Sequence, residues 1–228
     1  MPDILLHLLP HVVSSLLYGV LGMHFWHTRW RETDRPLVTL PMQPWERAAI
    51  LAALVVQGIG LYQGLFSAGG MRFSFSFALS LMLWLAVLIY WLESFHARMD
   101  GLQPMVLPLA AISALAPALF PQLRVVANAG AWGFQLHFLT AMLAYSLFTL
   151  SALHAVFMGF AERKLHQRAV TKSLTSLPPI LTMEALLFRM ILVAFCLLTV
   201  ALLSGVMFAE AIFGRAMAVD HKTLFAFA

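Results

Sequence analysis

Residues 136–146 read Leu136-His137-Phe138-Leu139-Thr140-Ala141-Met142-Leu143-Ala144-Tyr145-Ser146 and lie near the start of an apolar run that extends over residues 134–160. A helix needs about 20 apolar residues to cross the hydrocarbon core of a bilayer, so this run is long enough to span one. It places the imidazole of His137 at one end of the span. Ionisable groups are costly at that position and are usually there for a function.

The rest of the chain shares this apolar character. Of its 228 residues, 61% are hydrophobic and 11% are charged, and the mean hydropathy is +0.86. This composition excludes a soluble globular domain. We therefore predict an all-α, polytopic integral membrane bundle with six spans and the start of a seventh. The predicted spans cover residues 4–26, 48–66, 73–92, 105–120, 134–160 and 186–210.

The segment 105–120 is the shortest of these spans and contains Pro108 and Pro117, so a tilted, kinked or re-entrant segment is the alternative. We expect a span, because the topology then closes consistently. The six residues after Lys222 resemble the first turns of another helix but are too few to cross a bilayer. Residues 1–3 contain no basic group of the kind that begins a signal peptide, so we expect the first span to be retained.

The positive charge of the chain indicates its orientation in the membrane. The sequence pI is about 9.6, and the basic residues fall in short loops between spans, which argues against nucleic-acid binding. With the N-terminus outside, nine Lys and Arg residues lie in inner loops and four in outer loops, as the positive-inside rule requires. We expect a bacterial inner-membrane protein with a cytoplasmic loop over residues 161–184 and an outer loop over residues 214–222.

Short catalytic motifs are missing from the sequence. Cys196 is the only cysteine, so no internal disulfide, CxxC pair or covalent CxxCH haem attachment is available. The chain contains no P-loop, GxGxxG or HExxH motif. Gly60 and Gly64 form a GxxxG in the second predicted span, which permits close helix approach or occurs by chance. We expect a binding protein and not an enzyme.

Two histidines should lie on the same side of the membrane. His137 stands near the outer end of its span, and His221 follows the last span in the outer loop. The imidazole is a common axial ligand of haem iron, so we predict a noncovalent, b-type haem whose iron is bound by His137 and His221. Asp220 is adjacent and is able to orient an imidazole. Tyr145 follows His137 by about 80° around the helix and is a candidate for the same cavity.

A second pair of histidines is a weaker candidate. His154 lies roughly 25 Å along the helix from His137, so the two cannot bind one ligand. His24, near the inner end of the first span, would form an inner pair with His154. In the alternative interpretation of the outer pair, His137 caps a helix or forms a hydrogen bond within the bundle, and His221 is solvated.

Four stretches of the sequence resemble the cytochrome c assembly family, which includes the CcsA and CcmC haem-handling membrane proteins, and the nearest branch is that of the HemX-like inner-membrane proteins. The stretches are residues 136–148, residues 177–189 with Leu177-Pro178-Pro179, Leu203-Ser204-Gly205-Val206-Met207-Phe208, and Asp220-His221-Lys222-Thr223.

The resemblance extends from about residue 130 to residue 228. It implies that His137 is one of two histidines that flank an outer, tryptophan-rich segment and present haem. Residues 208–220 occupy that segment. They retain Gly214 and Asp220 but contain Met217 and Val219 in place of tryptophans. The second histidine of the family follows a further span, so the assignment of His221 rests on its expected depth and not on the resemblance.

From these observations we expect an accessory protein of cytochrome c maturation that binds haem at its outer face. Its partners would be the lipid bilayer, haem and cytochrome c maturation proteins, with no nucleic acid. Three alternatives stay open. One is a regulator of haem biosynthesis that acts through residues 162–184 and binds no haem; the others are a small-molecule transporter and a b-type electron carrier that also uses His24 and His154.

Overall fold

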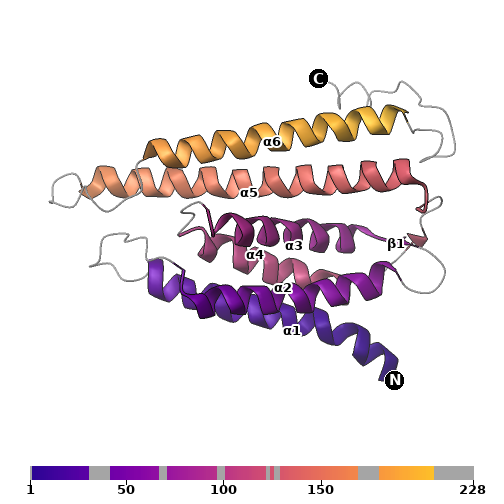
Figure 1. Cartoon of the computed structure of the whole chain (residues 1–228). Coiled ribbons are helices and arrows are strands. Elements are labelled where there is room, and N and C mark those ends of the chain that lie inside the picture. Colours follow the sequence, from indigo (N-terminus) through magenta and orange to yellow (C-terminus); the bar gives the residue numbers. More distant parts are fainter. Residues whose placement is uncertain are drawn as a thin grey trace.

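The computed structural model describes residues 2–30, 42–66, 71–96, 101–121, 124–125, 129–168 and 180–207 (Figure 1). These residues are almost entirely helical. The elements are α1 (Pro2–Phe25), a π-helical turn η1 (Trp26–Trp30), α2 (Pro44–Leu65), β1 (Arg72–Phe73), α3 (Phe75–Glu93), α4 (Gln103–Leu119), β2 (Arg124–Val125), α5 (Trp132–Arg168) and α6 (Ile180–Met207).

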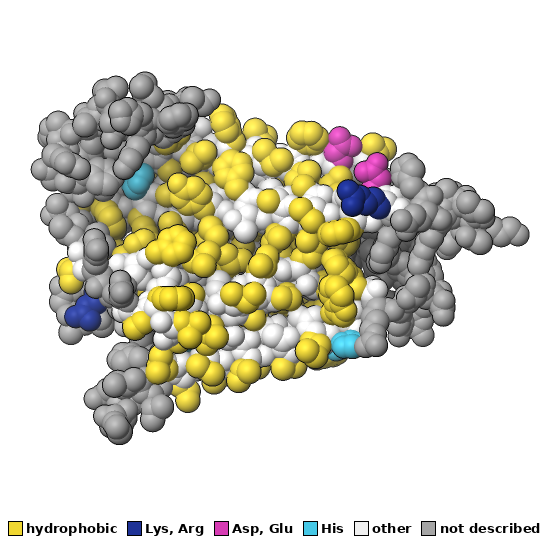
Figure 2. Space-filling model, turned by 180° about the vertical axis from the view of Figure 1, so that it is seen from behind, with side chains coloured by type: hydrophobic (Ala, Val, Ile, Leu, Met, Phe, Trp, Pro, Cys, Tyr) yellow, Lys and Arg dark blue, Asp and Glu magenta, His cyan; other side chains and the backbone are white. Residues whose placement is uncertain are grey.

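Within the described residues, five helices are long and apolar enough to cross a membrane, and these are α1, α2, α3, α5 and α6. The protein is therefore a multi-pass membrane protein. The fourth predicted segment forms α4, a shorter apolar helix of 17 residues that continues through Pro108 and Pro117. Figure 2 shows hydrophobic side chains across the middle of the bundle on the face seen, with the charged side chains toward its ends.

Two helices are longer than their apolar segments. α5 continues to Arg168 and α6 begins at Ile180, so both helices extend into residues 161–184, where we expected a loop. Bilayer thickness limits the apolar part of a helix, whereas backbone hydrogen bonding continues beyond it into polar sequence. Hydropathy therefore located these two helices but not their ends.

The helices run side by side and alternate in direction (Figure 1). α1 packs on α2 and α4, and α3 packs on α2, α4 and α5; α6 packs chiefly on α5. We call the end of the bundle that holds the short antiparallel ladder β1–β2 the β end. The opposite end, where α1 stops and α2 begins with Glu46, is the Glu46 end.

The apolar core lies among α1, α2, α3 and α4. It contains large, fully buried side chains such as Tyr18, Phe25, Ile50 and Leu107. α5 and α6 reach this core through few residues, among them Leu150. The hairpin of α5 and α6 is consequently attached to the side of a four-helix unit.

The GxxxG of α2 contacts two different helices. A Cβ atom at Gly60 would lie 2.9 Å from the Pro10 Cβ on α1, and a Cβ at Gly64 would overlap the Phe77 ring on α3. Both glycines therefore permit close helix approach, which was one of the two interpretations of this motif.

Candidate functional site

His137 lies in the second turn of α5, at the β end, and is half-buried against α6. Its Nδ1 atom is 2.9 Å from the Ala201 carbonyl oxygen. A carbonyl oxygen only accepts hydrogen bonds, so the Nδ1–H group of His137 is the donor. Ser204 also donates its hydroxyl to the Ala201 oxygen, at 2.9 Å, and its Oγ lies 3.4 Å from the same Nδ1 atom.

This arrangement determines the tautomer of the neutral imidazole. With the proton on Nδ1, the Nε2 atom of His137 carries the free lone pair. No bond to Nε2 occurs within the part of the chain that the structure describes. A histidine that binds a metal typically donates its other N–H to a carbonyl or carboxylate, which fixes the ring orientation. His137 meets this condition.

Gly205 allows the His137 ring to lie against α6. A Cβ atom at this position would be 3.2 Å from His137 Cε1 and 3.4 Å from Nδ1. Contacts this short would require the imidazole to shift by a few tenths of an ångström. The absence of a side chain at Gly205 and the small side chain of Ser204 therefore leave the space that the ring occupies.

His154, also on α5, is buried and bonds to α6 in the same way. Its Nε2 atom is 3.1 Å from the Met183 carbonyl oxygen, to which it donates. Among the described residues, the buried Nδ1 atom of His154 has no hydrogen-bond partner. Both histidines of α5 thus reach α6, but at opposite ends of the hairpin, so they do not form one site.

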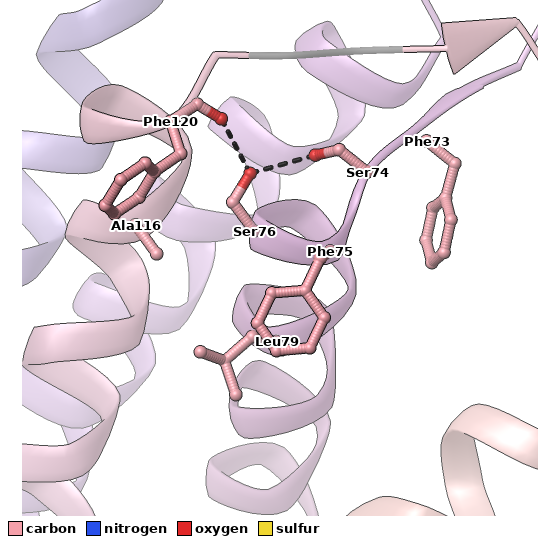
Figure 3. A pocket seen from close by; sticks show the side chains of 7 residues that line it. All are labelled: Phe73, Ser74, Phe75, Ser76, Leu79, Ala116 and Phe120. Carbon is pink, nitrogen blue, oxygen red and sulfur yellow. Dashed lines mark hydrogen bonds between the residues drawn. The ribbon is translucent and has the colours of Figure 1, made fainter.

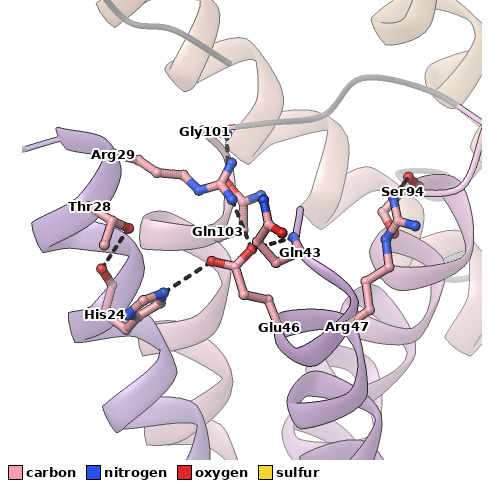
Figure 4. Close-up of polar contacts among 9 residues, drawn as sticks. All are labelled: His24, Thr28, Arg29, Gln43, Glu46, Arg47, Ser94, Gly101 and Gln103. Carbon is pink, nitrogen blue, oxygen red and sulfur yellow. Dashed lines mark hydrogen bonds and ion pairs between the residues drawn. The ribbon is translucent and has the colours of Figure 1, made fainter. Parts of the chain in front are cut away.

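His24 belongs to an ionic cluster at the Glu46 end (Figure 4). Its Nε2 donates to Glu46 Oε1 at 3.0 Å, and Arg29 donates to Glu46 Oε2 at 3.0 Å. The Gln43 backbone N–H donates to the same Oε2 atom at 2.7 Å. The Glu46 and Arg29 side chains are 5% and 6% exposed. These bonds join the end of α1 to the start of α2.

The structure gives the two inner histidines different partners. The Nε2 atom of His24 bonds to a carboxylate and that of His154 to a backbone carbonyl. Each bond has an evident packing role, and neither imidazole is directed to the other by a bond. The described residues thus provide no support for an inner haem held by this pair.

Of the other predicted site residues, the structure describes Tyr145 only. Tyr145 lies on α5 with half of its surface exposed, and the described residues show no hydrogen bond or ring contact between it and His137. Asp220 and His221 lie outside the described residues. Within the described part, no group of three or more His, Cys, Asp or Glu residues is placed to hold a metal ion.

A family model for cytochrome c assembly proteins matches residues 45–228, which is more than half of the chain. The chain belongs to the cytochrome c assembly protein family. No curated protein and no solved structure matches it. The match begins well before residue 130, where we saw the resemblance start, and it includes α2 to α6 with His137 and His154. His24 precedes it.

Sequence reasoning missed the residues that support His137 in this cytochrome c assembly protein. Ser204 and Gly205 belong to a stretch that resembles the family, and the pairing of two small residues was a usable signal. The role of the Ala201 carbonyl has no counterpart in the sequence, because a backbone acceptor looks the same at every residue. Only the antiparallel packing of α5 on α6 shows it.

A cavity that the sequence did not predict lies at the β end of this assembly protein (Figure 3). Its volume is about 520 Å³, within the range of small-molecule sites. It lies where α3 begins and α4 ends. Its lining consists of Phe73, Ser74, Phe75, Ser76, Leu79, Ala116 and Phe120. The Phe73 ring packs edge-to-face on Phe138 of α5 at 5.2 Å, so the cavity and His137 lie at the same end of the bundle.

Proposed function

We propose that this cytochrome c assembly protein handles haem during cytochrome c biogenesis and binds it noncovalently, as a b-type haem, through His137. The family is linked to haem handling. The observation that carries the proposal is the imidazole of His137, whose Nδ1–H is held by the Ala201 carbonyl while Nε2 is left as a ligand. His137 would supply this nitrogen to the iron, and α6 would hold the ring at a fixed angle.

His221 is the proposed second axial ligand, and Asp220 the proposed group that orients it. This part of the proposal rests on the sequence, in which both residues follow the last predicted span and would return to the depth of His137. Tyr145 is proposed to lie beside the porphyrin. This assignment has the least support of the four, because the Tyr145 side chain is half exposed on α5. His24 and His154 are proposed to have structural roles.

We also infer the family branch, the membrane, the orientation and the partners of the protein. We place it in the HemX-like branch, in a bacterial inner membrane, with six spans, the start of a seventh, and its N-terminus outside. The distribution of Lys and Arg supports this orientation. The β end, with His137, would then be the outer face. We propose a binding protein and not an enzyme, one that passes haem to other cytochrome c maturation proteins.

The test is a haemin titration of the purified protein in detergent, followed by visible absorption with and without dithionite. We expect wild-type protein to develop a reducible Soret and α band. His137→Ala and His221→Ala should each weaken haem binding by about tenfold or more, as loss of a ligand or its support does in metal sites. His96→Ala serves as the matched control, because His96 is an exposed histidine at the Glu46 end.

Rescue with free imidazole makes the test specific to ligation. His137→Gly should regain its bands when imidazole is added, whereas a variant that has merely misfolded should not. A wild-type protein that takes up no haemin contradicts the proposal and favours a regulator that acts through residues 162–184. Two haems per chain, sensitive to His24→Ala and His154→Ala, would instead indicate a b-type electron carrier.

A further inference from the structure

The cavity at the β end is a groove between α3 and α4. Phe75 and Leu79 lie on the α3 side, and Ala116 and Phe120 on the α4 side (Figure 3). Phe75 is 83% exposed and Phe120 is 65% exposed, so the rim of the groove faces the surroundings of the bundle. Because α3 is long and apolar enough to cross the membrane, these surroundings include lipid acyl chains.

The polar groups of the groove are already bonded to one another. Ser76 donates its hydroxyl to the Phe120 carbonyl oxygen at 2.8 Å. Its single hydrogen is thereby used, so Ser74 must donate in the 2.9 Å contact between the two hydroxyls. Ser74 in turn accepts from the Phe77 backbone N–H at 3.4 Å. The two serines therefore have no hydrogen left to offer to an anion.

A cationic residue adjoins the lining of the groove in the sequence. Arg72 is exposed and directly precedes Phe73, which lines the groove. β1 pairs with β2, which holds these residues at the end of the bundle where α3 begins. The described part of the chain contains no ion pair to Arg72. A basic residue at the level of the headgroups attracts anionic lipids, and an apolar groove between helices offers contact to an acyl chain.

We propose that this groove binds an anionic phospholipid, with one acyl chain between α3 and α4 and its phosphate at Arg72. Because the hydrogens of both serine hydroxyls are already used in hydrogen bonds, the phosphate would be bound by the guanidinium group of Arg72 alone. The apolar lining of Phe75, Leu79 and Ala116 provides contact with the acyl chain but no selection among headgroups. A substitution at Arg72 should therefore change the preference for anionic lipids, whereas a substitution in the lining should change how much lipid of either kind is bound. This site is independent of haem binding at His137.

The test measures which lipid stays on the protein. The full-length chain is reconstituted in nanodiscs of equal parts phosphatidylglycerol and phosphatidylcholine, released in mild detergent, and analysed by native mass spectrometry. We expect phosphatidylglycerol to be retained over phosphatidylcholine by about fivefold, the ratio typical of one basic residue near a membrane surface. Arg72→Gln should remove this preference. Arg163→Gln, which removes an exposed arginine near the end of α5, should keep it.

A second variant tests the groove itself. Ala116→Leu fills the space between α3 and α4 and should lower retention of both lipids, whereas Ala152→Leu, on an exposed face of α5, should not. Circular dichroism confirms that each variant is folded. The proposal is wrong if wild type shows no preference or if Arg163→Gln removes it equally. It is also wrong if Ala116→Leu leaves retention unchanged, since Arg72 would then attract lipid without a groove.

Discussion

The neighbours of a histidine decide what its imidazole is able to bind. His137 and His154 lie on one helix and both donate to backbone carbonyls of α6, yet they use different nitrogens. His137 is half-buried and keeps its Nε2 lone pair for a ligand, whereas the remaining nitrogen of His154 is enclosed in the bundle. The same residue type on the same pair of helices thus leaves a nitrogen available for the proposed ligand in one place and is enclosed by packing in the other.

The contact between His137 and Gly205 leads to a prediction. In Gly205→Ala, the new methyl group would lie 3.2 Å from His137 Cε1 and should displace the ring from the Ala201 carbonyl. We expect haem affinity to fall by about tenfold, as it does when a metal ligand loses its support. Haemin titration provides the measurement. Gly159→Ala is the control, because a Cβ at Gly159 meets nothing within 4 Å; equal losses in both variants would contradict the prediction.

A second prediction concerns His154. His154→Ala removes a buried side chain together with its bond to the Met183 carbonyl. We expect this variant to lose about 2 kcal/mol of stability through the cavity and the lost hydrogen bond. Thermal unfolding in detergent, followed by circular dichroism, measures the loss. Haem uptake should match wild type, and a loss of haem bands as large as in His137→Ala would show that His154 is a ligand.

At the scale of the elements, the close approach of α2 to its neighbours depends on glycine. Gly64→Ala should force α2 away from α3, because its methyl group would overlap the buried Phe77 ring, which has little room to move. We expect a cost of about 1–3 kcal/mol, typical of an overpacked core. Thermal unfolding tests this expectation against Gly19→Ala, whose methyl group would meet no atom within 4 Å. A cost no larger than that of the control would contradict it.

The elements also show how far the sequence determines the structure. Apolar runs located the helices, since the requirement to cross a bilayer appears directly in composition. Hydropathy did not predict that α5 continues to Arg168 or that α6 begins at Ile180, because helical hydrogen bonding does not stop at the edge of the apolar segment. His137 was identifiable as a candidate ligand from its position in a predicted span. Its acceptor, the Ala201 carbonyl, and the groove between α3 and α4 depend on packing between distant segments.

At the scale of the whole molecule, the distribution of Lys and Arg predicts that the β end is outside. Single cysteines in a Cys196→Ala background test this with a maleimide that does not cross membranes. Val125→Cys, at the β end, should react in intact cells, and His96→Cys, at the Glu46 end, only after lysis; both positions are exposed. The reverse pattern would place His137 on the cytoplasmic side and would contradict delivery of haem at the outer face.

The two hydrogen bonds from α5 to α6 oppose sliding of one helix past the other. The histidine donors are 17 residues apart in the sequence and their acceptors 18. The two hydrogen bonds are therefore separated by roughly 25 Å along the helix axes. A shift by one helical turn, about 5 Å, would break both at once. The register of α5 on α6 is therefore fixed, and the hairpin is attached to the four-helix unit mainly through α3. Any motion that moves His137 relative to that unit should carry α5 and α6 together as one body.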